Sequence, residues 1–110
     1  MIRVTVYKTG RHEYMGFDVE GHAAYDESGK DIVCAAVSAL VINTINSIEH
    51  FTDDKTSCVT EEESGSIVYR FQNPPSHDAG LLLDSMILGL EEIEDSSDYE
   101  PYIDIIFKEV

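Results

Sequence analysis

Residues 31–42 of the chain read DIVCAAVSALVI and contain the longest apolar run in the sequence, 11 residues from Ile32 to Ile42. No Gly or Pro occurs from Ile32 to about His50, and aspartate is a residue type that caps helices. The pattern predicts a helix that begins at Ile32, with Asp31 as its N-cap. Because its first three turns are apolar on nearly every side, we expect this helix to be largely buried. A run of this length, with Ser38 inside it, is too short to span a membrane.

The segments on either side of this helix show the alternation of apolar and polar residues that is typical of β-strands. Residues 2–7 alternate in this way, and residues 14–20 follow as a hairpin partner. Residues 56–62 and 66–71 predict a second hairpin, with its turn at residues 63–65. These segments indicate an antiparallel arrangement.

The second half of the chain predicts one more helix and one more strand. Ser76 follows a Pro-Pro break as an N-cap, and residues 77–94 have apolar side chains at helical spacing. The acidic residues 91–100 are expected to be a solvated helix end and linker, followed by a last strand over residues 102–107.

The resulting order of elements is β-β-α-β-β-α-β, which predicts an α+β fold. We expect a two-layer α/β sandwich, with two main helices on one face of a mostly antiparallel sheet of about five strands. The length of 110 residues suits a single domain, residues 1–110.

Charge is the unusual feature of the composition. Seven Lys and Arg residues against 22 Asp and Glu give a net charge of −15. Such a surface repels polyanions, so we expect no direct nucleic-acid binding and no binding to an anionic membrane. A basic protein is the natural partner.

The cysteine content indicates a reducing compartment. Cys34 and Cys58 are too few for a disulfide scaffold, and the alternating N-terminus does not resemble a signal peptide. We therefore expect a soluble cytoplasmic protein. The two cysteines and four scattered histidines lack the spacing of zinc ligands, so no metal or other cofactor is predicted.

Cys34 and His22 are the candidate catalytic residues. With Asp31 as the cap, Cys34 is the third helical residue, where the helix dipole and unpaired amides favour a thiolate. His22 lies 12 residues earlier in a polar loop between Gly21 and Gly29, whose composition predicts mobility and closure onto the thiol. A cysteine and a histidine are the minimal nucleophile and base. The alternative is that Cys34 is a small, inert core residue.

Three further residues have candidate roles near or away from this pair. Asp31 either caps the helix or orients His22, and in either role its charge opposes a thiolate. Ser38 either lines the site or bonds back to its own helix. Cys58, in a polar strand, is interpreted as structural.

Two blocks of sequence resemble the ribosomal-processing cysteine proteases of Firmicutes and related bacteria. They are Gly21-His22-Ala23 and residues 31–40, and the spacing between them is also similar. The resemblance implies an endopeptidase that removes a short N-terminal extension from a large-subunit ribosomal protein, in support of ribosome assembly. It implies that Cys34 is the nucleophile and His22 the base, with a ribosomal protein precursor as substrate. It also implies a homodimer and a two-layer α/β domain.

Two other functions remain open from the residues alone. One is a non-enzymatic acidic module that binds a basic ribosomal or assembly protein, with Cys34 packed in its core. The other is a redox sensor in which Cys58 resolves an oxidised Cys34. For the protease, oxyanion donors are expected among the amides at the helix start, including that of Cys34.

Overall fold

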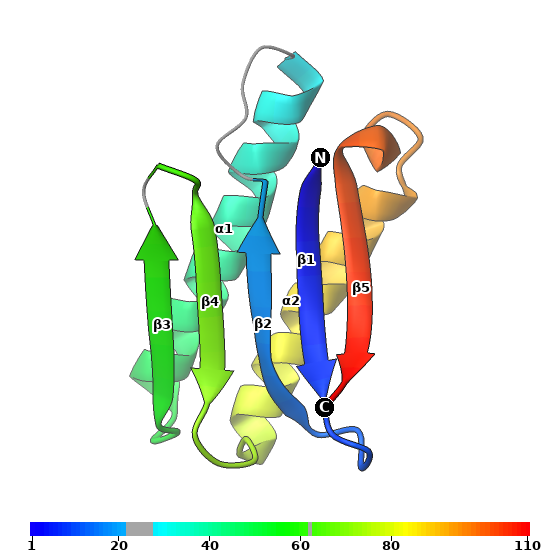
Figure 1. Ribbon diagram of the computed structural model, residues 1–110. Helices are drawn as coiled ribbons and strands as arrows, with labels where there is room; N and C mark the ends of the chain where they lie inside the picture. Colours follow the sequence, from blue (N-terminus) through cyan, green and yellow to red (C-terminus); the bar gives the residue numbers. More distant parts are fainter. Residues whose placement is uncertain (22–27, 62) are drawn as a thin grey trace.

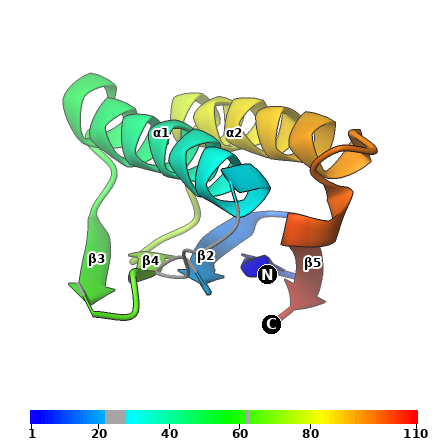
Figure 2. The same ribbon diagram turned by 90° about the horizontal axis from the view of Figure 1, so that it is seen from above.

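Both long helices lie on one face of a five-stranded sheet, so the molecule has two layers (Figures 1 and 2). The computed structural model describes residues 1–21, 28–61 and 63–110. The elements are β1 (Ile2–Lys8), β2 (Tyr14–Glu20), α1 (Ser28–Phe51), β3 (Thr56–Glu61), β4 (Ser66–Phe71), α2 (His77–Asp95), the 3₁₀ turn η1 (Glu100–Tyr102) and β5 (Ile103–Glu109). The predicted order and α+β class are confirmed.

The strand order across the sheet is β3-β4-β2-β1-β5, and three of the four pairings are antiparallel. The exception is β1 with β5, which pair in parallel from Ile2↔Ile103 to Lys8↔Glu109. Since β4 and β5 run in the same direction, α2 is the crossover that carries the chain over one face between them. The prediction of a mostly antiparallel sheet is therefore confirmed.

Alternation within the strands buries one face of the sheet under the helices. Val4, Phe17 and Tyr69 are fully buried in three neighbouring strands, and they form one core with Val37 of α1 and Leu83 of α2. Period-two strands and period-3.6 helices thus supply the two halves of a single apolar layer.

The start of α1 differs from the prediction. The helix begins at Ser28, so Asp31 lies inside its first turn and the predicted N-cap is wrong. Gly29, expected as the end of a loop, is also helical. Starting a turn earlier leaves the same residues facing the core, so apolar periodicity does not determine where the helix begins.

The expectation that α1 is largely buried is also wrong. Ile32 is 53% exposed and Ile42 is 49% exposed, and Ala35 and Ala39 are exposed between them. The sheet covers one side of the helix and α2 covers one flank, so the remaining apolar side faces outward. The 20-residue segment Ile32–Phe51 has the length and hydropathy of a membrane-crossing helix, but here it packs against the sheet.

Both ends of α2 match the predicted helix to within one residue, whereas the predicted acidic linker begins later than expected. The Ser76 hydroxyl accepts a hydrogen bond from the Ala79 amide at 3.2 Å, which confirms the N-cap. The helix continues to Asp95, so the first half of the predicted acidic linker is helical. Glu94 is also more than a solvated helix end, because its carboxylate accepts a 2.9 Å hydrogen bond from the Ile105 amide of β5.

Candidate active site

Cys34 lies in the second turn of α1, half-buried, with its side chain packed against the core. Because the helix begins at Ser28, Cys34 is its seventh residue rather than its third. The unpaired amides and the strongest dipole effect belong to the first turn. The position of Cys34 at the helix terminus, from which its activation and the use of its amide as an oxyanion donor were predicted, is therefore wrong.

Ser38 lies one turn after Cys34. Its hydroxyl donates a 2.7 Å hydrogen bond to the Cys34 backbone carbonyl oxygen. Of the two predicted roles, bonding back to the helix is confirmed. The bond holds the hydroxyl close to the α1 backbone beside the candidate nucleophile.

The flank of α1 that carries Cys34 faces the β3 side of the sheet. Ser38, Ile45 and Glu49 follow Cys34 at helical spacing and lie on the same flank of α1. The Glu49 carboxylate raises the pKa of the Cys58 thiol of β3, so this flank lies on the β3 side. The opposite flank faces α2, where a Cβ placed on Gly89 would lie 3.1 Å from Leu40 Cδ1. Cys34 therefore opens toward the β3–β4 hairpin and away from α2.

Cys58 is a thiol exposed on β3 rather than a core residue. Local burial and the Glu49 carboxylate raise the pKa of this thiol, which makes it a poor nucleophile. Glu49 is 15 residues from Cys34, about 22 Å along the helix axis. Since a disulfide needs Cα atoms within about 7 Å, Cys58 cannot resolve an oxidised Cys34 in this conformation.

The three histidines that the structure describes lie far from Cys34. His50 is 16 residues further along α1, about 24 Å along its axis. His12, in the turn between β1 and β2, and His77, at the start of α2, line one pocket of about 310 Å³. Figure 1 shows this turn, the end of α1 and the start of α2 at one end of the sheet, with the start of α1 at the other.

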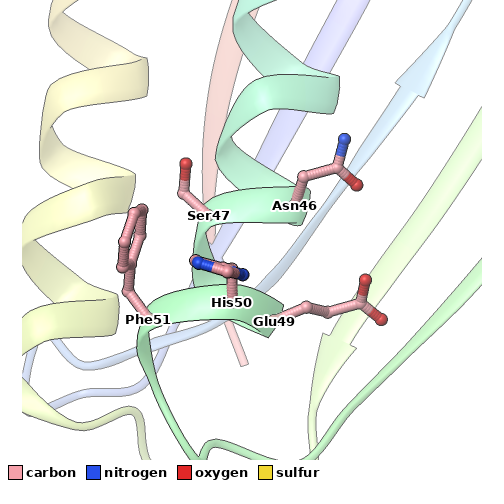
Figure 3. A pocket seen from close by; sticks show the side chains of 5 residues that line it. All are labelled: Asn46, Ser47, Glu49, His50 and Phe51. Atoms are coloured by element: carbon pink, nitrogen blue, oxygen red, sulfur yellow. The ribbon is translucent and has the colours of Figure 1, made fainter.

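The pocket around His50 lies at the same remote end. Figure 3 shows its side chains on the last turns of α1. The volume of the pocket is about 490 Å³. His50 and Phe51 stack edge to face with their ring centroids 4.7 Å apart, and Phe51 is 71% exposed. This pocket therefore lies too far from Cys34 to form part of its site. Its lining residues are Asn46, Ser47, Glu49, His50 and Phe51.

The predicted catalytic loop lies partly outside the described residues. His22 and the segment to residue 27 are not described, nor is the side chain of Asp31, so the pairing of His22 with Cys34 and the closure of the loop stay predictions. Gly21 is described, with φ +78°, and a Cβ there would lie 2.2 Å from the Met1 carbonyl oxygen. Only glycine lets the chain pass this close to Met1, at the end of the sheet where α1 begins (Figure 1).

Within 1–21, 28–61 and 63–110, no group of side chains could hold a metal ion.

A half-buried cysteine on a helix can serve as the nucleophile of a thiol hydrolase. The chain belongs to the cysteine protease Prp family, whose model matches residues 1–104. It is 32% identical over 100 residues to the ribosomal processing cysteine protease Prp of Bacillus subtilis, covering 86% of this chain and 88% of that protein. It is 28% identical to the protein of that name from Staphylococcus aureus, covering 86% and 90%.

Three solved structures have the same fold. The S. aureus protease in complex with a substrate peptide superposes with a TM-score of 0.91 at 27% identity, covering 98% of this chain and all of that one. The S. aureus protease with a covalently linked product peptide gives a TM-score of 0.87 at 28% identity, with the same coverage. A protein from Streptococcus mutans gives 0.85 at 26% identity, covering 100% and 99%.

Proposed function

We propose that residues 1–110 form one domain, a cytoplasmic endopeptidase that removes a short N-terminal extension from a large-subunit ribosomal protein. Cys34 is its nucleophile and His22 its base. The observation that carries this assignment is the position of the other three histidines at the far end of the sheet. Gly21, at the end of the sheet where α1 begins, directly precedes His22 in the sequence. The names of the B. subtilis and S. aureus relatives support the ribosomal substrate.

The reaction follows from this pair of residues. His22 takes the proton from the Cys34 thiol, and the thiolate sulfur attacks the scissile carbonyl carbon. The C–N bond breaks as His22 returns the proton to the leaving amine, which leaves the new N-terminus of the ribosomal protein. Water, deprotonated by His22, then hydrolyses the thioester and regenerates the thiol.

The charge of the chain supports a basic substrate. At −15, its surface attracts a cationic ribosomal protein and repels RNA. Exposed carboxylates lie on the β3 side of the molecule, with Glu49 near the end of α1 and Glu61 at the end of β3. These side chains favour positively charged residues in a substrate that reaches this side.

The test is cleavage of a candidate ribosomal precursor, with the cut located by mass spectrometry. We expect Cys34→Ala, Cys34→Ser and His22→Ala to abolish cleavage while circular dichroism stays unchanged. His12→Ala, His50→Ala and His77→Ala are matched controls and should each retain full activity, as should Cys58→Ser. Full activity in Cys34→Ala would overturn the mechanism. Binding of the precursor without any cut by the wild type would instead favour the acidic binding module.

We also propose a homodimer, formed through the outer side of α1. Ile32, Ala35, Ala39 and Ile42 are exposed there at the 3-4-3 spacing of a helix–helix seam. No charged residue occurs from Ile32 to Ile48. Two copies that each carry −15 repel one another, so an uncharged face is where they can approach.

A further inference from the structure

The two edges of the sheet differ in how their backbone groups are satisfied. At the β5 edge, the Ile105 amide already donates to the Glu94 carboxylate of α2. At the other edge, every residue of β3 after Thr56 is exposed, so neither helix covers this strand. The β3 edge is therefore open to another strand along its length, whereas the β5 edge is bonded to α2 at Ile105.

The register identifies which groups on β3 point outward. The Lys55 carbonyl oxygen accepts a 3.0 Å hydrogen bond from the Gln72 amide, so residues 55 and 72 form a hydrogen-bonded pair. Hydrogen-bonded and non-hydrogen-bonded pairs alternate in an antiparallel ladder. Ser57 and Val59 therefore bond to β4, while the N–H and C=O groups of Cys58 and Thr60 point to the open edge.

This edge lies beside the last turns of α1 (Figure 2). Glu49, on the same flank of α1 as Cys34, raises the pKa of the Cys58 thiol of β3, which agrees with this placement. Figure 1 shows the end of β3 and the first turns of α1 at the same end of the sheet. Cys58 is paired across the ladder with buried Tyr69, and Thr60 with buried Ile67. Paired residues project to the same face, so both side chains point toward the helix side of the sheet. An extended chain along β3 would run toward the end of the sheet where α1, the helix that carries Cys34, begins (Figure 1).

We propose that the substrate binds as an added strand along β3 and pairs with the outward backbone groups of Cys58 and Thr60. This inference rests on the proposed protease function. Proteins recognise extended peptides in this way, with main-chain hydrogen bonds for affinity and neighbouring side chains for specificity. Val59, 64% exposed, offers an apolar contact, and exposed Glu49 and Glu61 complement a basic peptide. The occupant is thus the basic segment of a ribosomal precursor that spans its cleavage site.

Amide hydrogen exchange in the Cys34→Ala protein tests this pairing directly. The probe is a synthetic peptide that covers the cut established with the wild-type enzyme. We expect saturating peptide to slow exchange of the Cys58 and Thr60 amides at least about tenfold, as expected for amides that gain a hydrogen-bond partner. The Phe107 amide, two residues after Ile105 on the opposite edge, is the internal control and should not change.

A matched pair of variants provides a kinetic test. Thr60→Pro removes an outward N–H without removing a bond to β4, whereas Thr60→Ala keeps that N–H and removes the side chain. We expect Thr60→Pro to raise KM about five- to tenfold with little change in kcat, which corresponds to the loss of one hydrogen bond. Thr60→Ala should change KM less than about twofold. If Thr60→Pro fails to fold, the exchange measurement stands alone.

The outcomes separate this inference from the function on which it rests. Cleavage of the precursor without protection of the Cys58 and Thr60 amides overturns the pairing and leaves the protease intact. Protection that appears without peptide and grows with protein concentration means that a second copy occupies β3, which also overturns it. Failure of the wild-type enzyme to cut any ribosomal precursor overturns both.

Discussion

The Ser38 hydroxyl donates a 2.7 Å hydrogen bond to the Cys34 carbonyl oxygen, one turn earlier in α1. Because this bond ties the hydroxyl to its own helix, we expect Ser38 to support the local structure rather than react. Ser38→Ala should lower kcat/KM less than about threefold and change the free energy of unfolding by about 1 kcal/mol at most. Chemical denaturation and cleavage kinetics measure the two effects. A loss of activity comparable to that of Cys34→Ala, in a folded protein, would instead give Ser38 a direct role in the reaction.

The proposed dimer predicts a change of oligomeric state for a charge on the outer side of α1. Ile42→Glu places a carboxylate at the seam of two chains that already repel each other, so the protein should become monomeric. Sedimentation velocity measures the mass. Leu88→Glu is a matched control, because Leu88 is 61% exposed on α2, and that variant should remain dimeric. A wild-type protein that is monomeric at all concentrations would contradict the proposal.

The acidic surface predicts an effect of salt on substrate capture. Charges more than about 10 Å apart are screened at ~0.1 M salt, so kcat/KM for a basic precursor should fall steeply as salt rises. For a short neutral peptide with the same cleavage site, kcat/KM should change little, and kcat should be nearly constant for both substrates. Equal salt slopes for the two substrates would mean that the charge serves solubility alone.

Tyr14 predicts a loss of stability at alkaline pH. Burial, together with the hydrogen bond from its hydroxyl to Asp84, raises the pKa of Tyr14 above its usual value of 10.0. Between the unfolded and folded pKa values the unfolded chain binds fewer protons, so the stabilisation from Tyr14 is complete below about pH 10 and is lost as pH rises beyond it. The slope from this group is at most about 1.4 kcal/mol per pH unit.

Tyr14→Phe isolates this contribution. The variant should be less stable than the wild type at pH 7 by about 1 kcal/mol, because the Asp84 hydrogen bond is lost. Its deficit should shrink as pH rises above 10, measured by urea denaturation at each pH. A constant difference between the two proteins across this range would contradict the assignment.

Much of the fold follows from local sequence patterns. Period-two alternation predicts the strands, and apolar side chains at helical spacing predict both helices in their correct order. The Ser76 cap is also predictable, because a capping side chain bonds to an amide only three residues away. These features depend on near neighbours in the chain, which is the information that a sequence shows directly.

The errors at the start of α1 and in the acidic linker have a different cause. Core-facing periodicity is unchanged when a helix starts a turn earlier, so the pattern could not distinguish Ser28 from Ile32 as its first residue. The acidic composition of residues 91–95 indicates solvent, yet Glu94 bonds to a strand that follows it in the chain. An acidic side chain looks the same in sequence whether water or a distant amide is its partner.

The sequence by itself determined the order of the elements and the choice of Cys34 and His22 as the candidate pair, because residue type, spacing and motif carry that information. Only the tertiary structure decided that the last turns of α1 lie beside β3, that the described histidines lie at the far end, and that an amide at the β5 edge is bonded to α2. These relationships join residues distant in sequence. They are set by how the helices pack on the sheet and by the parallel pairing of β5 with β1, which no local pattern encodes.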